Sequence, residues 1–304
     1  MTKTVTTHTR ARCAVIDIGS NTTRLLVAEP HPERPGALVE VAAHRAFVRL
    51  TARERRTGIP ADKAQAIAEA VAEQALTARA NDIAALRVVA TAALRDAPGR
   101  DVLLAQLSAA AGVQVEVLSG EEEARLAFAG ATASLGRNGG GTVVVADIGG
   151  GSTELAAGAP GHAPTWWASV PIGSGALADA HLHGDPPTAA QIAAARAEAA
   201  AAIAAAGCPP ADVAWAVGGS ATSLRRLCGE RLSASALDDA LTRVTAGPAA
   251  VTALDLDLHV ERVRLLPAGL VLLAEVARAA KCPLHVGCGG LREGVVLDLM
   301  GEVE

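Results

Sequence analysis

The apolar residues of this 304-residue chain fall into two alternating patterns. Short apolar runs typical of buried strands occupy 13–18, 38–50, 85–95, 113–118, 142–158 and 213–219. Segments with the spacing of helices lie between and after them, at 60–82, 101–112, 119–131, 188–206, 234–245, 247–256 and 267–280. Strands that alternate with helices predict an α/β fold with central sheets.

The pattern restarts near the middle of the chain, after a glycine-rich segment at 135–141. A strand–turn–strand unit opens each half. We therefore predict two similar lobes, 1–132 and 133–304, with 135–141 as the hinge. In this division a helix at about 291–302 ends the second lobe. The alternative is that this helix packs back on the first lobe.

The two strand–turn–strand units carry the same glycine-rich turn. The segments IDIGSNTTRL (16–25) and ADIGGGSTEL (146–155) both follow the pattern D-I-G-x-x-[ST]-T-x-L, with their aspartates 130 residues apart (147 − 17). Either turn alone is typical of a tight hairpin. Two matched copies in separate lobes favour a shared cleft that grips a phosphate chain from both sides, because successive N–H groups in such turns bind phosphate oxygens. Asp17 and Asp147 would repel phosphate unless a metal ion lay between them, which indicates Mg²⁺.

Composition narrows the class of protein. Half of the residues are apolar and 19% are charged, which indicates a globular chain, while two Phe, three Trp and no Tyr predict an aliphatic core. The net charge of −5 and the scarcity of aromatic residues argue against nucleic acid as a partner. No apolar run reaches membrane-spanning length, and the N-terminal segment lacks a signal-peptide core, so we expect no membrane partner. Five cysteines in a long chain favour reduced thiols and a cytoplasmic location.

The double turn resembles the two phosphate loops of the actin, Hsp70 and sugar-kinase superfamily. Further blocks narrow the resemblance to the exopolyphosphatase and guanosine pentaphosphate phosphatase family, whose order they follow: AVIDIGSNTTRLLV, VVATAALRDA, LSGEEEARLAF, ADIGGGSTEL, VPIGSGAL, AVGGSATSL, LPAG and GGLREGVVLDL. The resemblance implies two ribonuclease-H-like α/β lobes with a cleft between them, in a short form without the helical C-terminal region of longer members. It also implies release of terminal orthophosphate from inorganic polyphosphate with Mg²⁺, or with Mn²⁺ in its place.

The resemblance further assigns roles to individual residues. In SGEEEAR, Glu122 is the implied general base; Glu154 is the second implied catalytic residue and, with Asp17 and Asp147, an implied metal ligand. The implied phosphate-binding residues are Ser20, Asn21, Arg24, Arg95, Gly149, Gly150, Gly151, Ser152, Thr153, Gly219 and Ser220. The residues themselves leave open which of the three consecutive glutamates points inward, since an acidic first turn also complements the helix dipole.

Two segments depart from the family pattern. RLTARERRTG (49–58) stands where the family often has R-L-G-x-G; it either extends a polyanion track through Arg53, Arg55 and Arg56 or forms a solvated charge run, and the second is favoured. Gly287 and Cys288 replace a usual Ser-Asp pair. Three alternative functions stay open: a guanosine pentaphosphate 5′-phosphohydrolase, a kinase or ATPase of the same superfamily, and a catalytically weak homologue that senses polyphosphate or nucleotides. A homodimer also stays open.

Overall fold

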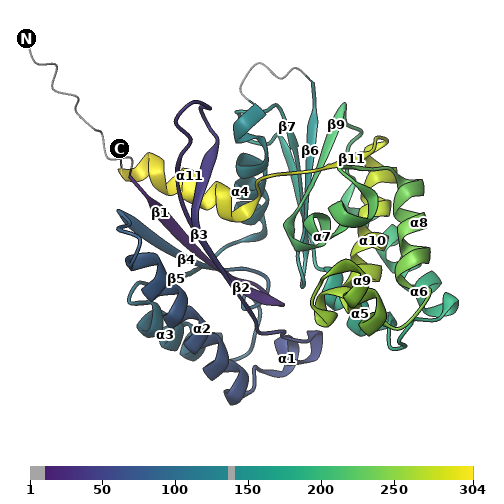
Figure 1. Ribbon diagram of the computed structural model, residues 1–304, viewed down its shortest axis with the longest axis horizontal. Helices are drawn as coiled ribbons and strands as arrows, with labels where there is room; N and C mark the ends of the chain where they lie inside the picture. Colours follow the sequence, from purple (N-terminus) through teal and green to yellow (C-terminus); the bar gives the residue numbers. More distant parts are fainter. Residues whose placement is uncertain (1–10, 136–140, 304) are drawn as a thin grey trace, which may run out of the picture.

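The computed structural model describes residues 11–135 and 141–303. The first of its two sheets has five strands. Its strands are β1 (Cys13–Ile18), β2 (Thr22–Pro30), β3 (Leu38–Phe47), β4 (Ala85–Ala90) and β5 (Val115–Val117), in the order β3-β2-β1-β4-β5. β1 is antiparallel to β2 and parallel to β4. Helices α2 (Ala61–Arg79) and α3 (Arg100–Ala111) pack together on one face of this sheet (Figure 1). The short α1 (Ala52–Thr57) follows β3.

The second sheet repeats this topology and adds one strand. Its strands are β6 (Val143–Ile148), β7 (Thr153–Gly158), β8 (Trp166–Val170), β9 (Val213–Val217), β10 (Arg231–Leu232) and β11 (Leu284–Val286), in the order β10-β11-β9-β6-β7-β8. The run β8-β7-β6-β9-β11 matches β3-β2-β1-β4-β5, with β6 antiparallel to β7 and parallel to β9. The predicted fold class, two α/β lobes of the actin-like type, is confirmed.

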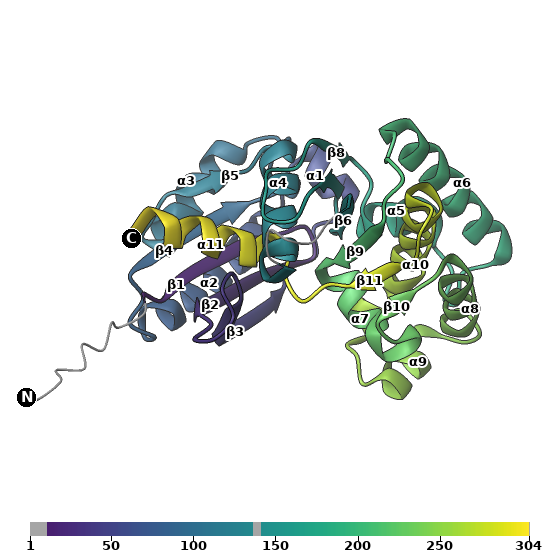
Figure 2. The same ribbon diagram turned by 90° about the horizontal axis from the view of Figure 1, so that it is seen from above.

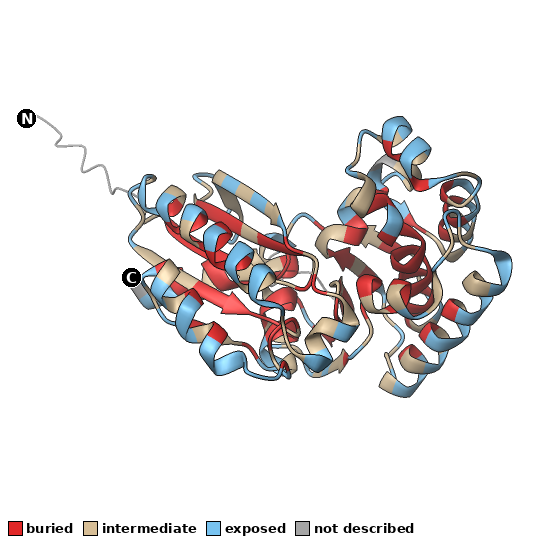
Figure 3. Cartoon of the chain, turned by 90° about the horizontal axis from the view of Figure 1, so that it is seen from below, coloured by how far each residue is buried: buried red, intermediate tan, exposed pale blue. Residues whose placement is uncertain are grey.

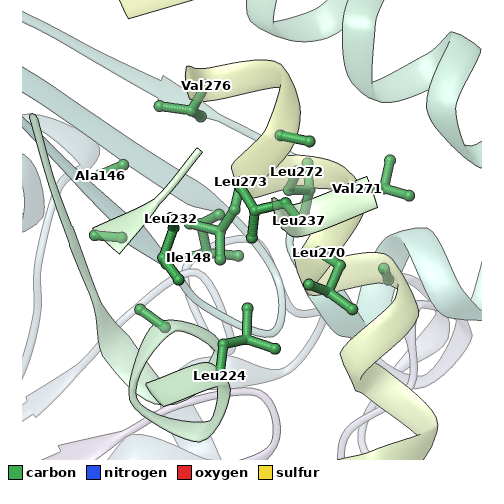
Figure 4. Close-up of a cluster of buried hydrophobic side chains, with 14 of the residues drawn as sticks. Ala146, Ile148, Leu224, Leu232, Leu237, Leu270, Val271, Leu272, Leu273 and Val276 are labelled. Atoms are coloured by element: carbon green, nitrogen blue, oxygen red, sulfur yellow. The ribbon is translucent and has the colours of Figure 1, made fainter. Parts of the chain in front are cut away.

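Helices of the second lobe surround a core built from aliphatic residues and alanine. They are α5 (Ser174–His181), α6 (Ala189–Ala206), α7 (Gly218–Cys228), α8 (Ala234–Val244), α9 (Ala249–Leu256) and α10 (Val260–Ala280). Leu270 and Leu273 of α10 pack with Leu224 and Leu232 in this core (Figure 4). Buried residues follow the strands and the inner helix faces, and the outer faces are exposed (Figure 3). Within the described ranges, no helix combines the length and the apolar character needed to cross a membrane.

Helix α10 begins seven residues before the predicted start at Pro267 (267 − 260). Proline favours the first turn of a helix, which made Pro267 the expected beginning. In the structure Pro267 is buried inside α10, and His259 caps the helix by accepting the N–H of Glu261 at Nδ1. Burial of the flanking leucines outweighs the cost of an interior proline here.

Two helices connect the lobes. α4 (Gly120–Thr132), followed by a 3₁₀ turn (Ala133–Leu135), precedes the second sheet in sequence and packs on it through Ala124 and Phe128. The last helix, α11 (Leu291–Val303), returns to the first sheet and packs on β1 through Val295 and Val296 (Figures 1 and 2). α4 and α11 also pack against each other, so both lie at the junction of the lobes. The predicted hinge falls mostly on 136–140, outside the described residues.

Candidate active site

The two glycine-rich turns have the same backbone. In each, the first glycine donates its N–H to a carbonyl three residues later, Gly19 to Thr22 and Gly149 to Ser152, both at 3.0 Å. The strands on either side are in the same register, which pairs Asp17 with Arg24 in the first lobe and Asp147 with Glu154 in the second. The sequence repeat is therefore a repeat of structure.

The turns lie against each other across the cleft. A Cβ built on Gly150 would overlap the Asn21 side chain, and a Cβ on Gly151 would lie 2.6 Å from Ser20 Oγ. Glycine is needed at both positions because side chains of the first turn fill that space. The second turn is fixed from behind by α5, whose Ser174 donates its N–H to Gly149 O at 2.9 Å.

The turns present free backbone donors to a cavity of about 310 Å³. Across the described residues, five turn N–H groups donate no hydrogen bond: those of Ser20, Asn21, Gly150, Gly151 and Ser152. Such a group of N–H donors is suited to phosphate oxygens. The predicted residues that line this cavity are Asp17, Ser20, Asn21, Arg24, Asp147, Gly149, Gly150, Gly151, Ser152, Glu154 and Gly219.

Glu122, the implied general base, is not among the lining residues, so its position does not fit that role. It is exposed and is the third residue of α4, where its Oε2 accepts the N–H and the hydroxyl of the N-cap residue Ser119, each at 2.9 Å. These bonds to the charged form lower the pKa of Glu122. This is a capping box, which uses the carboxylate to satisfy the helix end.

Glu123 takes the inward position instead. One residue further along α4 rotates the side chain by about 100°, and Glu123 is only 5% exposed and lines the cavity. Its carboxylate pairs with Arg95, whose Nε also donates to Leu118 O at 3.0 Å. Arg95 therefore lies behind Glu123 rather than in the cavity lining.

Two further predicted phosphate-binding residues are outside the lining. Thr153 is fully buried and donates its hydroxyl to Ile172 O at 2.7 Å. Ser220 is buried against α10, 3.0 Å from the Cβ position of Gly269. Both support the walls of the cleft.

Six acidic residues of the described ranges line the cavity, and four of them have a pKa raised by burial: Asp17, Glu123, Asp147 and Glu154; the other two are Glu40 and Glu293. Burial is the main cause that raises the pKa of all four groups. The pKa of Asp147 rises to about 6, and the negative charge of Asp17 adds to the effect of burial. The negative charge of Glu154 further raises the pKa of Glu123. Burial and the charge of Asp147 raise the pKa of Glu154 to about 7, although the side chains of Ser152 and Ser169 hydrogen-bond to Glu154 and stabilise its charged form.

The donor set suits a hard cation that is shared with a phosphate ligand. Asp17 Oδ1 is buried and has no hydrogen-bond partner among the described residues. Over the described ranges, no three His, Cys, Asp or Glu side chains form a ready metal cage. Mg²⁺ needs no such cage, since it is usually held by one or two carboxylates together with water and substrate phosphates. Asp17 and Asp147 could supply those carboxylates.

Arginines line the other side of the same cavity. Burial lowers the pKa of Arg24 to about 9 and that of Arg262 to about 10, with neighbouring positive charges adding to the effect. The Nε of Arg262 is buried without a hydrogen-bond partner. The sequence did not single out Arg262, because α10 was expected to begin after it; Arg292 lines the cavity too and lies in the quoted block GGLREG.

Two equivalent α/β lobes, with facing glycine turns, buried carboxylates and arginines in one cleft, define an actin-like enzyme that acts on phosphoryl groups. The Ppx/GppA phosphatase family model matches residues 31–303. Exopolyphosphatase 1 of Mycobacterium tuberculosis is 30% identical over 306 residues, which cover 94% of this chain and 87% of that protein.

Solved structures agree with this family match. The crystal structure of an exopolyphosphatase-like protein has a TM-score of 0.83 and 28% identity, with 97% of this chain and 100% of the other covered. A Ppx/GppA family member from Aquifex aeolicus has a TM-score of 0.78 and 25% identity, with 96% and 97% covered. The chain belongs to the Ppx/GppA phosphatase family, and is thus an enzyme of the phosphoanhydride hydrolase class.

Proposed function

We propose that this enzyme releases terminal orthophosphate from inorganic polyphosphate, with Glu123 as the general base. The observation that carries the proposal is the entry of the Glu123 carboxylate into the same cavity as both glycine turns. The exopolyphosphatases among its relatives support polyphosphate as the substrate.

The two turns hold the terminal phosphoryl group in this proposal. The free N–H groups of Gly150, Gly151 and Ser152 and the hydroxyl of Ser20 donate to its oxygens, while Arg24 offsets their charge. Phosphoryl transfer depends mainly on positioning and on charge stabilisation, which these groups supply.

Glu123 accepts a proton from the attacking water. The water oxygen bonds to the terminal phosphorus, and the bond from that phosphorus to the bridging oxygen breaks, so the shortened chain leaves with the electron pair. A base must be ionised, but burial and Glu154 raise the pKa of Glu123. Arg95 opposes that shift and holds the carboxylate in place. Glu154, which accepts a hydrogen bond from Ser169, helps to orient the water in this proposal.

Mg²⁺ fits beside Asp17 and Asp147, where it would neutralise charge on the phosphate oxygens and favour the ionised form of the nearby carboxyls. Mn²⁺ has the same ligand preference. We expect removal of divalent cations with a chelator to abolish phosphate release, and added Mg²⁺ to restore it.

The decisive experiment measures phosphate release with Mg²⁺ from polyphosphate, guanosine pentaphosphate and ATP by the wild type, Glu123→Gln and Glu122→Gln. Glu123→Gln should lower kcat on polyphosphate by about 10²–10⁴-fold, the usual contribution of a general base. Glu122→Gln is the matched control and should keep wild-type activity, because glutamine also completes a capping box.

Equal losses in the two variants would contradict the assignment of the base. No release by the wild type from any of the three substrates would refute the hydrolase proposal. Faster release from guanosine pentaphosphate or ATP than from polyphosphate would identify that compound as the preferred substrate. The Glu123→Gln variant would still test the assignment of the base.

A further inference from the structure

A second, larger cavity of about 1170 Å³ adjoins the catalytic cleft. Its walls come from α1 and the loop before it in the first lobe, and from α5 and the start of α10 in the second. α1 lies beside α5 at the junction of the lobes (Figure 1). Ala92 lines both cavities, so the two spaces are neighbours. We call the larger cavity the α1 groove.

Helix α1 presents positive charge to this groove and turns its one carboxylate away. Arg53, Arg55 and Arg56 all line the α1 groove, but Glu54 does not. Glu54 is used at the helix start, where its Oε2 accepts the Thr51 N–H at 2.7 Å and the Thr51 hydroxyl at 2.9 Å. The capping box thus orders the helix and leaves the arginine charges on the groove side.

Arg55 connects the groove with the phosphate turns. Its Nη1 lies 2.6 Å from the Cβ position of Gly151, which is also 2.6 Å from Ser20 Oγ. The Nε of Arg55 is buried without a hydrogen-bond partner. Among the residues that the structure describes, its side chain makes no hydrogen bond or ion pair. A buried guanidinium nitrogen without a partner is costly, and a phosphate oxygen is the acceptor that Arg55 fits best.

The acidic residues of the groove are mostly engaged elsewhere. Asp179 accepts Arg49 Nη2 at 2.7 Å and the Ala52 N–H at 3.0 Å, which anchors α1 to the second lobe. Asp185 accepts the Ala249 N–H at 2.6 Å, and Glu198 pairs with a histidine. Among the lining carboxylates of the described ranges, Asp96 is the one without such a partner. The charge of Asp179 also acts on Arg55. Within the described ranges, however, no ion pair engages the side chains of Arg53, Arg55 or Arg56, so the α1 wall keeps three arginines for a ligand.

We propose that the α1 groove binds the phosphates of a polyphosphate chain that lie beyond the catalytic cleft. This inference rests on the proposed function, because it assumes that the chain's terminal phosphate occupies the glycine turns. The chain passes Arg55 and continues over Arg53 and Arg56. Arginine suits this role, since its planar guanidinium forms paired hydrogen bonds with phosphate oxygens. The smaller catalytic cavity alone would give no preference for long chains.

The test compares tripolyphosphate with long-chain polyphosphate in the double variant Arg53→Ala/Arg56→Ala. Both residues are exposed, so the fold should be preserved. We expect the KM for long-chain polyphosphate to rise about 3- to 10-fold, because each exposed charge pair in water contributes a factor of a few. The kcat, and the KM for tripolyphosphate, should not change. Added salt should reduce the difference between variant and wild type.

The matched control is Arg34→Ala/Arg243→Ala, which removes two exposed arginines outside both cavities. The same KM rise in this control, or an equal rise for both substrates in the α1 variant, would overturn the proposal. If the wild type releases no phosphate, the proposed function fails instead. Calorimetric titration with long-chain polyphosphate then tests binding to the α1 groove without any need for turnover. Weaker binding by Arg53→Ala/Arg56→Ala than by the wild type supports the proposal, and equal binding overturns it.

Discussion

The turn at 17–24 and the turn at 147–154 share a backbone and differ in the side chains they offer. Each begins with a partly buried aspartate and closes with the same N–H to carbonyl bond. Opposite the aspartate, the first turn places Arg24 and the second places Glu154. One turn thus brings positive charge to the cleft, and the other brings a second carboxylate.

The difference is also steric. Ser20 and Asn21 of the first turn occupy the positions equivalent to Gly150 and Gly151 of the second, and they fill the space that these glycines leave. Identical turns would collide or leave a gap. The two copies are therefore complementary, and the cleft depends on their having diverged.

Of substitutions within the two turns, the largest effect should come from the second turn. Glu154→Gln keeps the size of the side chain and its bond with Ser169, and removes the charge. We expect kcat on polyphosphate to fall about 10²–10³-fold, since Glu154 helps to place the water and to bind the cation. Steady-state kinetics measures the fall in kcat, and titration with Mg²⁺ measures the change in cation affinity. A kcat within the error of wild type would contradict the role assigned to Glu154.

Much of this arrangement could be predicted from the sequence, because the repeated turn identifies the two lobes and the two sides of the cleft between them. The choice among the three glutamates could also have been predicted. Ser119 and Glu122 form the S-x-x-E pattern of a capping box, which uses Glu122 at the helix end and leaves Glu123 to face inward.

Other parts could not be predicted, because they depend on tertiary packing. Pro267 lies inside α10, where burial outweighs its local preference, and this extends the helix back to include Arg262. For the segment 49–58 the sequence favours a solvated charge run over a polyanion track. It contains α1, and Arg55 contacts the second turn from the other lobe. Neither the position of Pro267 inside α10 nor the contact of Arg55 with the second turn has a local signal in the sequence.

A smaller effect is expected in the first turn. Arg24→Gln removes a positive charge and leaves a side chain that can still donate a hydrogen bond. We expect kcat/KM to fall about 10- to 100-fold, the range for loss of a hydrogen bond between charged groups. Arg45→Gln is the control, since Arg45 pairs with Arg24 in the neighbouring strand and does not line the cavity. Equal losses in both variants would indicate a general change in charge rather than a contact made by Arg24.

The smallest effect concerns the fit between the turns. In Gly150→Ala the new methyl group meets the end of the Asn21 side chain, which can move aside. We expect a loss of about 5-fold in kcat/KM, equivalent to about 1 kcal/mol at the low end of overpacking. A double-mutant cycle with Asn21→Ala isolates the contact, because the methyl group should cost little once the asparagine side chain is gone. Strictly additive losses would mean that Gly150 and Asn21 do not depend on each other, and would contradict the steric fit between the two turns.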